Sequence, residues 1–390
     1  MRVTGLLARV AVASLAAMPA LGPANAQELP GDEVQVSFNG YFDTYRVGIV
    51  YPTVSASRRV SESVSVSARY LVDAISAASM RSRFDVDGVT SATTNEGGGA
   101  DDSPDELRQE AGLGVTGLVG EGTASLNVLF STEHDYTSAT IAARASHPFH
   151  RKNTELSVGF VRSRDESFPQ TRDWRRDKTV TTLSAGVSRI LGRRTIAQAE
   201  LSYTDMSGFL SDPYQVVTIV YPDHASARRY EPASPDRRRR KAVGARVNRM
   251  IADGMSLQVG YRFYWDSWSV ESNTASALLR RHFRDGLVTL GIGGRYYRQT
   301  RADFFRESYD APEEFMTVDS KLDSGDSREV ELTVRAGGGL FGDLPVIGRE
   351  GVDLNASVAW YHRRTDTPDW FTRRTDLHAI VTSIGYRVRF

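Results

Sequence analysis

Charged side chains recur at every second position in several segments of this sequence, where they could line a polar channel. Arg262 and Asp266 alternate with apolar residues, and Arg295 begins a second such row. Successive side chains of a β-strand point to opposite faces, so each row would lie on one inner surface. There, arginines and carboxylates would orient polar solutes and set ion selectivity, or pair with one another and fill the interior. The predicted lumen residues are Arg69, Asp73, Glu200, Arg262, Asp266, Arg295, Tyr297, Gln299, Arg301, Asp303, Glu329, Glu331, Arg335, Asp353, Arg387 and Arg389.

Two other groups carry the residue types that catalysis or metal binding requires. Glu133-His134-Asp135 falls at a predicted external hairpin, but hydrolase chemistry would need further partners from other strands. The acidic loop between Asp85 and Glu106 could hold Ca²⁺, yet it lacks the later ligands of a calcium loop. A solvated strand end and a solvated loop are the simpler interpretations. We therefore predict no enzyme activity, no metal and no cofactor.

Two sequence motifs suggest phosphate binding. The run Arg237-Arg-Arg-Arg-Lys241 falls on the predicted external side, where it would pair with lipopolysaccharide phosphates or form a solvated strand start. Gly112-Leu-Gly114-Val-Thr-Gly117 fits the dinucleotide-binding pattern. It lies inside a predicted strand with no following helix, so the phosphate-binding geometry is absent.

The C-terminal segment Ile380–Phe390 has the pattern of a strand between lipid and a wet lumen. One face is apolar, interrupted only by Thr382, and the other carries Arg387 and Arg389. The segment resembles the closing strand of bacterial outer-membrane barrels, whose terminal aromatic residue is read by the assembly machinery. We predict that this machinery is a partner and that its signal consists of Ile384, Tyr386, Val388 and Phe390.

The N-terminus has the features of a cleavable signal peptide. Positive charge precedes the mostly apolar stretch Val10–Leu21, and Ala24-Asn25-Ala26 is a small-x-small cleavage site. We expect a signal peptide at 1–26 and an outer-membrane barrel at 27–390. The chain has no Cys and no net charge, with 48 residues of each sign. Balanced charge argues against a nucleic-acid partner.

Period-two alternation recurs along the chain, for example in Val64–Val72, Val259–Trp265 and Val352–Trp360. The predicted connections alternate between short and long, with Gly338–Gly351 as the one long connection on the short side. Together these patterns predict an all-β, transmembrane, antiparallel up-and-down β-barrel with short periplasmic turns and long external loops. We expect about 16 strands, or about 14 as the alternative, and an even number requires a strand near Val34–Phe42. A soluble β-sandwich also alternates, but it needs neither a terminal Phe nor alternating loop lengths.

Three segments resemble a family of predicted bacterial outer-membrane barrels known only as a domain of unknown function. They are Val72-Asp-Ala-Ile-Ser-Ala-Ala-Ser79, Tyr261-Arg-Phe-Tyr-Trp-Asp-Ser-Trp268 and Arg295-Tyr-Tyr-Arg-Gln-Thr-Arg-Ala-Asp-Phe-Phe305. The resemblance implies no substrate and no catalytic residues. It does imply a small envelope lipoprotein as a partner, because family members are encoded near one.

These observations place the mature chain in the outer membrane of a Gram-negative bacterium, in contact with lipid and lipopolysaccharide. The leading function is a channel for small polar solutes or a barrel scaffold in an envelope complex. An enzyme or surface receptor using the external loops is the first alternative. A sheath around an electron carrier is the second, and it needs a separate haem or flavin protein because the chain has no Cys.

Overall fold

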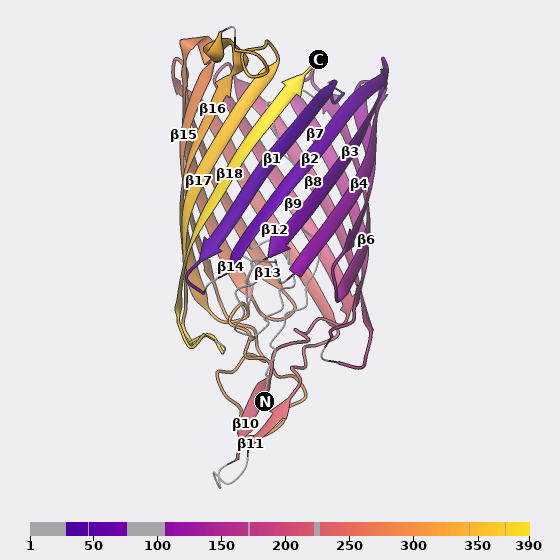
Figure 1. Cartoon of the computed structure of the whole chain (residues 1–390), viewed down its shortest axis with the longest axis vertical. Helices are drawn as coiled ribbons and strands as arrows, with labels where there is room; N and C mark the ends of the chain where they lie inside the picture. Colours follow the sequence, from indigo (N-terminus) through magenta and orange to yellow (C-terminus); the bar gives the residue numbers. More distant parts are fainter. Residues whose placement is uncertain are drawn as a thin grey trace.

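The computed structural model describes residues 29–45, 47–75, 106–170, 172–221, 227–342, 344–370 and 372–390. Within these residues sixteen antiparallel strands form one closed barrel (Figure 1). Strands that follow one another in the chain are neighbours throughout, except that β12 pairs with β9. The predicted barrel and the higher of the two strand numbers are thus confirmed. The predicted signal peptide and most of the acidic loop lie outside the described residues.

The barrel strands are long enough to cross a bilayer when tilted. They are β1 (Glu33–Asp43), β2 (Gly48–Ser61), β3 (Val64–Ile75), β4 (Glu106–Val119), β5 (Gly122–Thr132), β6 (Tyr136–Phe149), β7 (Thr154–Ser167), β8 (Arg176–Gly192), β9 (Thr195–Gly208), β12 (Arg237–Ala252), β13 (Met255–Asp266), β14 (Glu271–Phe283), β15 (Val288–Gln299), β16 (Gly325–Gly337), β17 (Val352–Thr365) and β18 (Asp376–Arg389).

Apolar side chains cover the outer wall of the barrel. Val128, Leu332 and Ile384 are exposed by 47%, 51% and 66%, values that only a lipid-facing or partner-facing surface explains. Polar or small residues occupy the alternate, inward positions. The period of two therefore has one cause on every strand: one face meets hydrocarbon and the other meets the lumen.

The barrel closes through a pairing between its first and last strands. Phe38 of β1 lies opposite Ile384 of β18, and Glu33 lies opposite Arg389. β1 contains the strand near Val34–Phe42 that an even strand number requires. The terminal Phe390 is 74% exposed, so it contributes little packing to the fold itself.

The two ends of the barrel differ in their connections. At the turn end, which is uppermost in Figure 1, most strands join through tight turns such as those at Gly120 and Gly254, which have φ of 60° and 67°. The longer connection between β16 and β17 contains a short 3-10 helix, η2 (Gly338–Phe341), and a second, η1 (Arg284–Gly286), joins β14 to β15. No helix in the described ranges is long and apolar enough to cross a membrane.

The loop end carries the longer connections. The one between β9 and β12 forms a small two-stranded sheet, β10 (Val217–Val220) and β11 (Ala227–Tyr230), which projects beyond the barrel rim (Figure 1). This sheet was not predicted, because strands of four residues are too short to show a reliable period.

Candidate functional site: the barrel lumen

The lumen contains a cavity of about 820 Å³ lined by twelve of the barrel strands, from β1 to β14. Small side chains make up most of its wall, among them Ser55, Ser67, Gly114, Ser157 and Ser184. A Cβ on Gly114 would lie 2.5 Å from the Ser67 hydroxyl oxygen, so a larger residue would displace its neighbours. The wall is therefore set back from the barrel axis, which leaves space for longer charged side chains to project.

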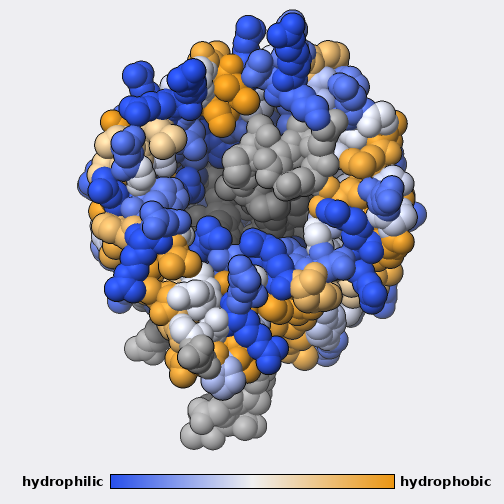
Figure 2. All heavy atoms as spheres, turned by 90° about the horizontal axis from the view of Figure 1, so that it is seen from above, coloured by the Kyte–Doolittle hydropathy of each residue, from blue (hydrophilic) through white to orange (hydrophobic). Residues whose placement is uncertain are grey.

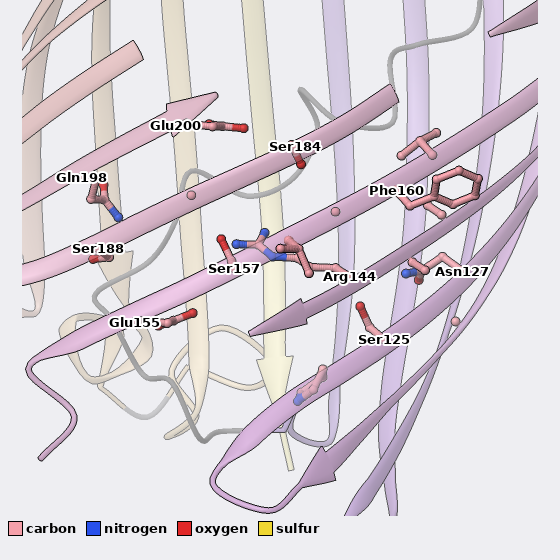
Figure 3. Close-up of a pocket in the computed structure, with 18 of the residues that line it drawn as sticks. Ser125, Asn127, Arg144, Glu155, Ser157, Phe160, Ser184, Ser188, Gln198 and Glu200 are labelled. Atoms are coloured by element: carbon pink, nitrogen blue, oxygen red, sulfur yellow. The ribbon is translucent and has the colours of Figure 1, made fainter. Parts of the chain in front are cut away.

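Of the residues that the structure describes, seven charged ones line this cavity: Glu33, Arg69, Arg144, Glu155, Glu200, Arg246 and Arg262. Figure 3 shows Arg144, Glu155 and Glu200 among serine side chains on neighbouring strands of the wall. The Arg246 Nε donates a hydrogen bond of 2.9 Å to the Gln198 side-chain oxygen on the neighbouring strand. The arrangement offers cations, carboxylates and amides to a polar solute within one chamber.

Glu200 and Arg262 illustrate how glycine shapes the cavity. Gly244 of β12 lies opposite Glu200 on one side and Arg262 on the other. An added Cβ at Gly244 would lie in ordinary van der Waals contact with Arg262, 3.9 Å from its Cγ, so the glycine leaves the space between the two charged side chains unfilled. Both charged side chains are exposed within the lumen and interact electrostatically. They form an opposed pair that a solute in the cavity can contact.

Closer to the loop end the charged residues are buried and paired. The Arg108 guanidinium lies 2.9 Å from Glu110 and 3.8 Å from Glu133, and Arg69 lies 3.8 Å from Glu110. Glu110 and Arg108 are 7% exposed and Glu133 is 8% exposed. Asp135 accepts a hydrogen bond from the buried Tyr214 hydroxyl. The two carboxylates that flank His134 thus contact arginine and tyrosine.

The predicted residues of β15 and β16 lie along one side of the wall. Arg295 lies opposite Glu329, and Glu331 lies opposite Gly293. The Arg295 guanidinium carbon lies 5.6 Å from the Tyr297 ring centre. Gln299 donates a hydrogen bond of 2.8 Å to the Lys321 carbonyl, so the end of β15 is tied to the following loop.

The structure differs from the sequence expectation at Arg301 and Asp303. Strand β15 ends at Gln299, so both residues lie in the loop and not on the barrel wall. Asp303 accepts a hydrogen bond of 2.5 Å from the Ser269 hydroxyl, and Arg301 lies 3.8 Å from Asp323. The period-two pattern alone would extend β15 beyond Gln299. Contacts with other loops take the place of strand pairing there. Asp73 is on β3, but its side chain lies outside the described part of the structure.

A second charged cluster lies on one side of the turn-end mouth. Asp353 lies 2.7 Å from Arg335 and 3.1 Å from Arg389, and Arg389 also lies 3.6 Å from Glu33. Arg387 donates hydrogen bonds of 3.0 and 3.2 Å to Gln35. Figure 2 looks onto this end and shows many hydrophilic side chains along its rim. The cluster joins β1, β16, β17 and β18 where the barrel closes.

At the loop end, Asp266 organises the turn between β13 and β14. Its side chain is fully buried and lies 2.5 Å from the buried Arg238. Tyr264 donates its hydroxyl hydrogen to the same carboxylate at 2.5 Å, and the backbone nitrogens of Trp268 and Val270 donate at 2.8 and 3.1 Å. Asp266 was predicted to line the lumen. Its contacts instead hold this turn together, and it presents no free carboxylate to the lumen.

The long loops pack against one another into a cap. Ala233 and Met316 exchange backbone hydrogen bonds of 2.9 and 2.7 Å, and the buried Gln215 accepts 3.0 Å from the Thr317 hydroxyl. Val217, Ile219, Tyr309 and Met316 form a buried apolar cluster. These contacts join the β9–β12 and β15–β16 connections into one packed unit beyond the strands.

Several charged lumen residues were not singled out by the sequence analysis. Arg144, Glu155 and Arg246 line the cavity, and the pair Lys178–Asp165, 3.4 Å apart, is buried near the loop end. The alternation that identified the other lumen residues also covers these strands. Arg246, for instance, lies between Gly244 and Asn248 on the inward face, opposite an outward Val243 and Val247.

The family model described as a protein of unknown function (DUF3570) matches residues 7–169 and 162–375. The chain belongs to this family. The match confirms the resemblance predicted from the three sequence segments. No curated protein is similar in sequence to this DUF3570 protein.

Solved outer-membrane barrels share the fold of this DUF3570 protein. A bacterial polysaccharide outer membrane secretin matches with a TM-score of 0.52 at 8% identity, over 92% of this chain and 98% of the other. The CymD monoaromatic hydrocarbon channel gives 0.45 at 12% identity, covering 95% and 91%. OprD from Pseudomonas aeruginosa gives 0.43 at 9% identity, covering 94% and 97%. The first of these likenesses shows the barrel fold alone, and none of them indicates a substrate.

Proposed function

We propose that this DUF3570 barrel is a conduit for small polar solutes across the outer membrane, with a weak preference for anions. The observation that carries the proposal is the cavity of about 820 Å³, walled by serine and glycine and crossed by charged side chains. A scaffold barrel has no need of such a chamber and could fill its interior with larger residues. Small polar wall residues instead keep the lumen wide and wet.

The preference for anions follows from the charges that face the cavity. Four arginines, Arg69, Arg144, Arg246 and Arg262, lie with three glutamates, Glu33, Glu155 and Glu200. A surplus of cations in a low-dielectric passage raises the local concentration of anions. Because glutamates lie between the arginines, the preference is small, and zwitterions or polar neutral molecules pass as well.

The proposal is tested by planar-bilayer conductance of the refolded full chain under a KCl gradient. We expect steady conductance and a reversal potential on the anion side. Arg262→Glu changes the charge of the lumen by two and is expected to move the reversal potential toward cation preference. Glu200→Gln is expected to move it further toward anions. Arg249→Glu makes the same charge change as Arg262→Glu on the outer wall near the turn end and is the matched control.

A bilayer that stays silent, with folding verified by heat-modifiable gel mobility, would contradict the conduit and favour the scaffold. The loop-end cap offers a specific reason for such a result, because its loops pack against one another beyond the strands at that end of the barrel (Figure 1). Conductance that responds equally to Arg249→Glu and Arg262→Glu would show that Arg262 does not lie on the ion path.

A further inference from the structure

The basic run at the start of β12 is divided between the two faces of the barrel wall. Arg238 is 7% exposed and pairs inward with Asp266. Arg237, Arg239 and Lys241 occupy the alternate, outward positions and are all exposed. A run of like charge thus places three cations on the outer wall near the loop end.

These outward cations are only partly neutralised. Arg237 forms a two-point contact with Asp205 on β9, with donor distances of 2.9 and 2.7 Å. Arg239 lies close enough to Asp205 to interact electrostatically. Among the ion pairs of the described residues neither Arg239 nor Lys241 takes part. Asp205 and Asp236 both interact with Arg237, so Arg239 and Lys241 are the two cations that remain outside an ion pair on a surface that otherwise faces lipid.

Aromatic residues place this surface at the membrane interface. Lys241 lies opposite Tyr203 on one neighbouring strand and Trp265 on the other. Trp265 stacks on Phe263, with ring centres 5.4 Å apart. Bands of aromatic side chains mark the boundary between hydrocarbon and headgroups in membrane barrels. Arg239 and Arg237 lie further toward the loop end than this aromatic group, at the depth of the headgroups of the outer leaflet.

We infer that the outward face of β12 at the loop end, formed by Arg237, Arg239 and Lys241, binds the phosphates of lipid A. A guanidinium matches the geometry of two phosphate oxygens, and a lysine supplies a further point charge. The loop end faces outward in a barrel of this class, and there the phosphorylated glycolipid forms the adjacent leaflet. This function is independent of conduction, because it uses the outer wall alone.

The test measures binding of diphosphoryl lipid A to the detergent-solubilised full chain by native mass spectrometry. The variant Arg239→Gln with Lys241→Gln removes the two cations of this surface that form no ion pair with any described residue. The control Arg189→Gln with Arg249→Gln removes two exposed outward cations from the turn end of β8 and β12. We expect about thirtyfold weaker binding in the first variant and unchanged binding in the control.

Dephosphorylated lipid A and inorganic phosphate identify the source of the interaction. Dephosphorylated lipid A is expected to bind the native chain and the Arg239→Gln, Lys241→Gln variant equally. Equal losses in both double variants would overturn the site, because the effect would then belong to overall charge. Binding of inorganic phosphate as tight as that of lipid A would overturn the lipid assignment. Both double variants are exposed substitutions, and heat-modifiable mobility verifies their folding.

Discussion

Replacing Asp266 with alanine tests whether the buried loop-end charges hold the barrel together. The Asp266 side chain is fully buried and Arg238 is nearly so. Removing one member of a buried ion pair costs about 3–5 kcal/mol, because the other charge stays buried without a partner. Loss of the hydrogen bonds from the Trp268 and Val270 backbone nitrogens adds about 1 kcal/mol each. The expected loss in the free energy of unfolding is therefore about 5–7 kcal/mol.

Urea unfolding in detergent micelles, followed by tryptophan fluorescence, measures this loss. Asp266→Asn keeps an acceptor oxygen and is expected to fall between the native chain and Asp266→Ala. Asp205→Ala is the matched control, since Asp205 makes the same two-point contact with an arginine on the same strand, but on the outer wall. Its unfolding midpoint is expected to stay unchanged. Equal midpoints for Asp266→Ala and Asp205→Ala would refute the reasoning.

Three further outcomes are expected. Lys178→Met leaves Asp165, which is 1% exposed, without its cation and should destabilise the barrel by about 3 kcal/mol. Adding Asp165→Asn to this variant should restore most of the lost stability. Burial raises the pKa of Tyr309 above its ordinary value of 10.0. The stability that the cap gains from the neutral tyrosine should therefore be complete below pH 10.0 and fall as the pH rises above it. Urea midpoints measured against pH should show a smaller alkaline loss in Tyr309→Phe. Phe390→Ala should leave the midpoint of the refolded barrel unchanged while lowering the amount assembled in the outer membrane, measured by membrane fractionation.

Each of these predictions has a result that contradicts it. A Lys178→Met barrel as stable as the native one would show that water reaches Asp165. An equally steep alkaline loss in Tyr309→Phe would place the titrating group elsewhere. Normal assembly of Phe390→Ala would remove the terminal aromatic residue from the assembly signal.

The barrel wall could be predicted from the sequence because the bilayer imposes one simple requirement on every strand. Val330 and Leu332 face outward on β16 while Glu329 and Glu331 alternate with them, and this alternation needs no knowledge of the partner strand. The same requirement places Arg237 on the outer face of β12 and Arg238 on its inner face. Strand ends were less predictable, as Arg301 shows, because hydrogen bonds to other loops decide where pairing stops.

The loop-end cap could not be predicted, because its contacts join distant segments that share no period. Gln215 meets Thr317 across 102 residues, and Tyr214 meets Asp135 across 79. Nothing in either local sequence identifies the other. The cavity also depends on where small residues from many strands coincide, and Gly244 between Glu200 and Arg262 is meaningful only once the register is known.

The pairing of β1 with β18 has a consequence for how the molecule is made. Glu33 and Arg389 meet directly, so the first strand finds its second neighbour only when the final residues are present. Until that moment two strand edges have unpaired backbone groups, which template aggregation. Joining such distant segments also costs chain entropy, and this entropy is lost before the contacts between the two strands have formed. The unassembled chain therefore depends on its strand edges being shielded from aggregation until β1 and β18 pair.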